Sequence, residues 1–125
     1  MSQYNILVVD DDREIVRSLG KLLELEGYRV KKAYNGMEAL DILMTEQIHL
    51  ILLDVMMPEM DGFEVCRRLK ADEQLKLIPV IFITALSDTE SESRGLALGA
   101  SDFLAKPLNV GIARQRIRNL IDRES

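Results

Sequence analysis

Short apolar runs alternate five times with segments of helical periodicity along this chain, and this alternation constrains the fold more than any other feature. Four of the runs are continuous, and they lie at positions 6–9, 50–53, 80–83 and, more weakly, 103–105. Continuous apolar runs are typical of strands that are covered on both faces. The fifth run, at 28–33, carries basic side chains and is expected to be an edge strand.

Between these runs the apolar residues recur with the spacing of an amphipathic helix. The helical stretches lie at 15–23, 37–44, 63–69, 87–98 and 112–121. The fourth of them opens with a capping box from Ser87 to Glu90 and stops at Gly99. Strand and helix therefore alternate in the pattern of a parallel sheet with helices on both faces.

The helical stretch at 87–98 differs from the other four. It contains Ser91, Ser93 and Gly95, which are poor helix formers, and few large apolar residues. Two interpretations remain open for it. It is either a weakly held helix that shifts, as a switch element must, or a polar helix on the surface.

Composition bounds the class of protein. A chain of 125 residues with 47% hydrophobic and 30% charged residues is expected to form one globular domain. Its net charge of −5 disfavours nonspecific nucleic-acid binding, despite the arginines at 114, 116 and 118. The single cysteine, Cys66, excludes an internal disulfide and fits a small buried thiol. No apolar run approaches the ~18 residues of a membrane span, so a cytoplasmic location is expected.

Polar residues follow the predicted strands at one end. Asp10 and Asp11 follow the first run, Asp54 the third, Thr84 the fourth and Lys106 the last. In an open α/β sheet, the carboxyl ends of the strands form the crevice in which ligands bind. We therefore expect these five side chains to meet at one edge of the sheet.

The chemistry that this set permits is narrow, because carboxylates at close range repel one another unless a cation joins them. The chain has no Cys/His cluster, so oxygen ligands that suit Mg²⁺ are expected. The lysine and the threonine hydroxyl would then hold a second anion, for which a phosphoryl group is the obvious candidate. A central carboxylate such as Asp54 can itself attack phosphorus and form an acyl phosphate.

Four segments of the chain resemble the receiver domain of two-component response regulators. They are ILVVDDD at 6–12, LLDVMMPEMDG at 52–62, VIFITAL at 80–86 and GASDFLAKP at 99–107. The resemblance implies a flavodoxin-like, doubly wound sheet of five parallel strands in the order 2-1-3-4-5. It also implies that residues 1–125 are a single receiver domain, either alone or excised from a longer regulator or hybrid kinase.

The resemblance assigns a role to each residue at the predicted edge. Asp54 matches the phosphoacceptor, which receives its phosphoryl group from a histidine kinase or a histidine phosphotransfer protein. Asp11 matches a direct Mg²⁺ ligand, Asp10 a residue that acts mainly through metal-bound water, and the main-chain carbonyl of Met56 a further ligand. Lys106 matches the phosphate-binding lysine, with a cis peptide bond to the proline that follows it.

The resemblance also implies a readout. Thr84 matches the hydroxyl that moves inward when the phosphoryl group arrives, and Phe103 stands at the position of the switch aromatic. The change would reach the face formed by 87–98, 103–105 and 112–121, which is also the expected homodimer or partner face. Such a domain binds neither nucleic acid nor membrane directly and is no enzyme beyond its own phosphorylation and dephosphorylation.

Several alternatives remain open. The three acids from Asp10 to Asp12 allow the acidic pair to shift by one residue, although alignment on Val8 and Val9 favours Asp10 and Asp11. A haloacid-dehalogenase-type phosphatase usually has a second Asp where this chain has Met56. An FMN carrier needs a phosphate loop where this chain has DDDRE. A degenerate receiver that never accepts phosphate is the strongest of the three rivals.

The residues two positions after Asp54 and Thr84 lead to a hypothesis about the lifetime of the acyl phosphate. They are occupied by Met56 and Leu86, which offer no base to activate water. If both side chains flank the phosphoryl group, they hinder in-line attack by water. We therefore expect a long-lived acyl phosphate.

Overall fold

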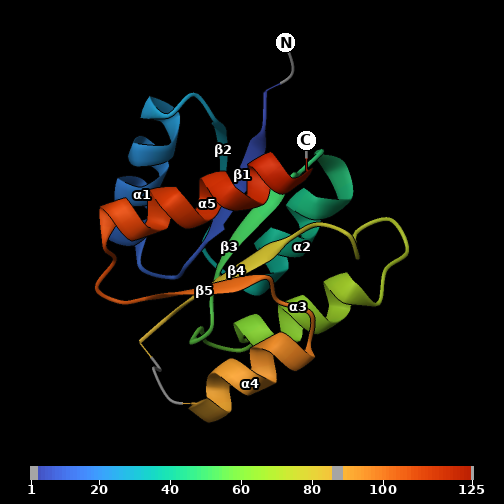
Figure 1. The fold of residues 1–125 in the computed structure, drawn as a ribbon. Helices are drawn as coiled ribbons and strands as arrows, with labels where there is room; N and C mark the ends of the chain where they lie inside the picture. Colours follow the sequence, from blue (N-terminus) through green and yellow to red (C-terminus); the bar gives the residue numbers. More distant parts are fainter. Residues whose placement is uncertain (1–2, 86–88, 125) are drawn as a thin grey trace.

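The computed structural model describes residues 3–85 and 89–124 and consists of a five-stranded parallel sheet between two layers of helices (Figure 1). The strands are β1 (Asn5–Val9), β2 (Arg29–Ala33), β3 (Leu50–Asp54), β4 (Val80–Thr84) and β5 (Asp102–Ala105). The helices are α1 (Arg13–Leu25), α2 (Gly36–Thr45), α3 (Gly62–Lys70), α4 (Thr89–Ala97) and α5 (Val110–Glu124). The strand order β2-β1-β3-β4-β5 confirms the predicted topology.

The central strands are buried on both faces, which explains their continuous apolar sequences. In β1, Ile6 and Val8 pack in the cluster that includes α1 and α5, whereas Leu7 and Val9 pack with α2 and α3. Every residue of β3 and β4 is buried. At the edge of the sheet, β2 exposes Arg29 and Lys32, so the prediction of a basic edge strand is confirmed.

The helices begin and end where the sequence supplies caps. At the starts of α1, α2 and α3, the side chains of Asp12, Asn35 and Asp61 accept hydrogen bonds from backbone N–H groups two or three residues later. Gly27 and Gly99 follow α1 and α4 with φ values of +96° and +101°, which glycine adopts without steric cost. None of the described helices combines the length and the apolar character needed to span a bilayer.

Helix α4 ends at Ala97, one residue before the predicted end at 98, and the predicted start, with Ser87 of the capping box, lies outside the described residues. Within Thr89–Ala97 the buried residue is Gly95, and large side chains such as Leu96 stay exposed. The helix is therefore polar and superficial, which agrees with both interpretations, and its closest approach to the rest of the protein is at a residue that has no side chain.

The buried central strands generate a stability prediction. Leu52 is completely buried in β3, and Leu77, in the loop before β4, is 83% exposed. We expect Leu52→Ala to lower the free energy of unfolding by about 2–5 kcal/mol, because the change removes buried apolar surface and leaves a cavity. Leu77→Ala should change it by less than about 0.5 kcal/mol. Denaturant titration of both variants measures the difference, and equal losses would contradict the assigned burial.

Candidate functional site

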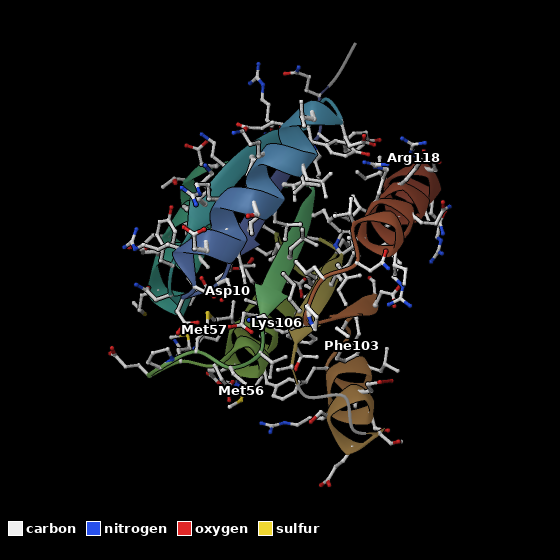
Figure 2. All side chains as sticks on the ribbon, turned by 90° about the vertical axis from the view of Figure 1, so that its left-hand side faces the viewer. Asp10, Met56, Met57, Phe103, Lys106 and Arg118 are labelled. Atoms are coloured by element: carbon white, nitrogen blue, oxygen red, sulfur yellow. The ribbon has the colours of Figure 1, made fainter. Side chains whose placement is uncertain are left out.

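The predicted polar residues lie together at the carboxyl edge of the sheet. Figure 2 shows Asp10 and Lys106 close to each other at this end, with Met56 and Met57 beside them, whereas Arg118 lies toward the opposite end. The strands run parallel, so residues from β1, β3, β4 and the end of β5 arrive at the same edge.

Two buried carboxylates share one ammonium group at the centre of the site. Asp10 and Asp54 are 0% and 2% exposed. The Nζ atom of Lys106 lies 3.0 Å from Oδ2 of Asp10 and 3.3 Å from Oδ1 of Asp54. The side chain of Lys106 is partly exposed, so the ammonium closes the site toward solvent while it pairs with both acids.

The charge balance of this cluster perturbs its protonation. Burial raises the pKa of Asp54 to about 7, the negative charge of Asp10 adds to the rise, and the Lys106 ammonium offsets it in part. Burial lowers the pKa of Lys106, but the two carboxylates more than compensate, so that pKa is raised and the lysine keeps its charge. The cluster therefore has one fixed cation and an excess of negative charge, which a further cation would relieve.

The donor set at this edge fits a hard divalent cation. One carboxylate oxygen from each of Asp10, Asp11 and Asp54 lies within 4.8 Å of the others. Among the described residues, Oδ2 of Asp10 is buried with the Lys106 ammonium, 3.0 Å away, as its close polar neighbour. Asp12 turns away and caps α1 through its contact with the backbone N–H of Glu14. The structure therefore clusters the two acids that the alignment favoured, and three oxygen ligands could hold a metal ion there.

The loop after β3 folds back onto Asp54. The backbone N–H of Met56 points at Oδ1 of Asp54 over 3.4 Å, and the side chain of Met56 is 60% exposed at the rim. A Cβ atom on Gly62 would lie 2.2 Å from the main-chain oxygen of Asp54, so only glycine permits this close return. Leu86, the other residue of the lifetime hypothesis, lies outside the described residues.

The predicted readout residues lie at the ends of the neighbouring strands. Thr84 is 3% exposed at the end of β4, and its carbonyl accepts a hydrogen bond of 2.9 Å from the backbone N–H of Lys106. The Lys106–Pro107 peptide bond is cis, as the resemblance implied. The ring of Phe103 packs beside that of Phe82, with centroids 5.5 Å apart.

Three of the four arginines of α5 have internal partners that the sequence did not reveal. Arg114 and Arg118 both approach Glu26 at the end of α1, at 3.4 Å and 3.0 Å. Arg116 points to the other side, where it pairs with Asp102 at 3.7 Å and donates a hydrogen bond to the carbonyl of Phe103. Neighbouring arginines two residues apart on a helix point in different directions, but no local pattern identifies acceptors that come from the end of α1 and from β5.

Comparison with known proteins agrees with the geometry. The family model for the response regulator receiver domain matches residues 6–118. The chain is 42% identical to the probable transcriptional regulator ycf27 of Cyanidium caldarium, covering 97% of this chain and 47% of that protein. It is 48% identical to the response regulator PleD of Caulobacter vibrioides, covering 92% of this chain and 25% of that protein. The receiver domain of the Francisella response regulator 1452 superimposes with a TM-score of 0.91 at 32% identity, covering 98% and 100% of the two chains. The chain thus spans half or less of these curated relatives.

The buried carboxylate pair generates a pH prediction. In metal-free buffer the folded chain binds a proton at Asp54 up to about pH 7, whereas the unfolded chain releases it near 3.8. The stabilising contribution of this proton is complete below about pH 3.8, falls as the pH rises from there, and is fully lost above about pH 7. Asp54→Asn should therefore gain stability relative to the wild type as pH rises from about 4 to about 7, by up to ~1.4 kcal/mol per pH unit, and should gain no more above about pH 7.

Denaturant titrations in EDTA at several pH values check this prediction. Asp12→Asn is the matched control, because Asp12 lies outside the cluster and asparagine also caps helices. The stability difference between Asp12→Asn and the wild type should not change in this way over the same range. A constant difference between Asp54→Asn and the wild type would contradict the raised pKa.

Proposed function

Because the chain belongs to the response regulator receiver domain family, we propose that it is the phospho-accepting switch of a two-component system and that Asp54 accepts the phosphoryl group. The donor is a phosphohistidine on a histidine kinase or a histidine phosphotransfer protein. The observation that carries the proposal is the buried carboxylate of Asp54 beside Asp10 and the Lys106 ammonium at the carboxyl edge of the sheet.

The transfer requires a carboxylate nucleophile. An oxygen of Asp54 attacks phosphorus, the P–O bond forms as the P–N bond to the donor imidazole breaks, and the imidazole leaves with the electron pair of that bond and is protonated from solvent. The Lys106 ammonium lies 3.3 Å from Oδ1 of Asp54, so it can follow the phosphoryl oxygens as negative charge builds on them. The protein holds the nucleophile rigid at the end of β3 and supplies the fixed positive charge of Lys106.

Asp10, Asp11, Asp54 and the main-chain carbonyl of Met56 would hold Mg²⁺. When bound, the ion supplies positive charge that offsets the carboxylates and the incoming phosphoryl oxygens. The raised pKa of Asp54 without metal supports this assignment, since added positive charge favours the ionised form that the reaction needs.

The readout passes through Thr84 and Phe103. The Thr84 hydroxyl approaches the phosphoryl group, the Phe103 ring follows into the space that the threonine leaves, and the face of α4, β5 and α5 changes for a partner or a second copy. Arg114 and Arg118 of α5 pair with Glu26, and Arg116 pairs with Asp102. These ion pairs support the proposal that this domain does not bind nucleic acid itself.

Residues 1–125 act as one receiver domain in this proposal and turn over no external substrate. The ycf27 and PleD relatives are both longer than this chain, and the output that the switch controls depends on the protein in which it works. The rival function is a docking module that has a complete site but never accepts phosphate.

Beryllofluoride, a phosphoryl analogue, tests the proposed switch. We expect it to shift the amide resonances around Asp54, Thr84 and Phe103 when Mg²⁺ is present, and to have no effect without the metal. Asp54→Ala should abolish the shifts because the analogue binds the carboxylate. If the amide resonances of the folded wild-type protein do not shift with beryllofluoride and Mg²⁺, the docking module is favoured.

The exposed thioether of Met56 predicts a long-lived acyl phosphate, because it offers no base to activate water. Loss of label from purified phosphoprotein in Mg²⁺ buffer should be slow. Met56→Glu should shorten the half-life at least about threefold by placing a general base at the rim. Met57→Leu, a change at a buried methionine, is the control. Rapid loss of label from the wild type would refute the hypothesis.

A further inference from the structure

Helix α4 approaches the rest of the protein at one glycine. Gly95 is the buried residue of this helix, and its neighbours on the helix are exposed. A Cβ atom built on Gly95 would lie 2.4 Å from Cζ of Phe103 and 3.1 Å from Cδ2 and Cε2 of Phe82. The first distance is far below van der Waals contact, so the Phe103 ring occupies the space that any other residue at position 95 would need.

The ring that blocks this space belongs to an aromatic cluster under α4. The chain contains three phenylalanines, and all of them take part. Phe63 of α3 meets Phe82 of β4 edge-to-face at 5.3 Å, and the Phe82 and Phe103 rings meet at a tilt of 37° with centroids 5.5 Å apart. The guanidinium of Arg94 lies over the ring of Phe63 at 4.3 Å. Helix α4 therefore rests on aromatic rings, with Gly95 as its closest point of approach.

The main chain of Phe103 is fixed, so the mobile part of this contact is the side chain. Phe103 pairs with Phe82 in the parallel ladder of β5 and β4, and its carbonyl accepts a hydrogen bond from Arg116 of α5. Figure 2 places Phe103 beside α4 and on the same side of the molecule as Lys106. A change at the edge of the sheet can move this ring without moving the strand that carries it.

We propose that Gly95 is a positioning residue of the switch. Because it has no side chain, the position of α4 depends on where the Phe103 side chain lies. While the ring lies against Gly95, α4 keeps the close approach of this structure. When the ring moves toward Thr84, it leaves an empty space beside Gly95. Glycine has no side chain to fill that space, so α4 shifts to close it. The proposal rests on the proposed function, since it assigns to the phosphoryl group the event that moves the ring.

A double-mutant cycle tests the contact without any ligand. Gly95→Ala should lower the midpoint of thermal unfolding by at least about 3 °C, because its methyl group clashes with the ring. In a Phe103→Ala background the same change should lose most of this cost, because the clashing atom is gone. Gly111→Ala is the matched control, since a Cβ there meets no more than Oδ1 of Asn109 at 3.4 Å and should not destabilise the fold.

Two results of the cycle would overturn the inference. One is a Gly95→Ala protein as stable as the Gly111→Ala protein, and the other is a full cost that persists in the Phe103→Ala background. If Gly95→Ala alone fails to fold, the double variant must recover a folded protein, and its failure to do so also overturns the inference.

Beryllofluoride affinity tests the coupling to the switch. Gly95→Ala blocks the ring position of the unliganded state, so in Mg²⁺ it should bind the analogue about threefold more tightly or better. The gain should vanish in the Phe103→Ala background and be absent in Gly111→Ala. A purely structural role for Gly95 would leave the affinity unchanged, and unchanged or weaker binding overturns the coupling. A wild type that does not bind the analogue overturns the proposed function, and the coupling with it.

Discussion

The pair of carboxylates buried at the end of β1 and β3 is the constraint on which the rest of the site depends. Removing two negative charges from water costs several kcal/mol for each ion unless opposite charges compensate. Here the ammonium of Lys106 lies within 3.3 Å of both Asp10 and Asp54. The acids cannot separate, because Asp54 is held by a fully buried strand and Asp10 directly follows another. The edge therefore keeps an excess of negative charge that attracts a cation.

Two glycines allow the backbone to approach Asp54 at the edge of the sheet and the ring of Phe103 beneath α4. At Gly62 the loop after β3 returns to the main-chain oxygen of Asp54, and at Gly95 helix α4 meets the Phe103 ring. A methyl group at either place would collide with its neighbour. One glycine shapes the rim of the site, and the other sets the distance between the aromatic cluster and the helix above it. Both depart from the rule that glycine weakens regular structure, and in both cases close packing explains the departure.

Much of the fold followed from local pattern. The continuous runs at 6–9, 50–53 and 80–83 became the buried strands within one residue of their predicted bounds, because burial on both faces demands apolar residues at every position. The basic run at 28–33 became the edge strand, because an edge strand is partly exposed to solvent and accommodates charged side chains. For helix α4 the sequence left two interpretations open, because it carries poor helix formers and few large apolar residues, and its packing residue is Gly95.

The sequence by itself determined which side chains reach the carboxyl edge, because in a parallel sheet the residue after each strand must arrive there. It could not decide between the pairs Asp10/Asp11 and Asp11/Asp12 without help from alignment, and the tertiary structure separated them by using Asp12 as a helix cap. The contacts of Gly95 with Phe103, and of Arg116 with the Phe103 carbonyl, were decided only by the tertiary structure. Such contacts join residues on different elements, and their partners are set by how helices pack on the sheet rather than by any local pattern.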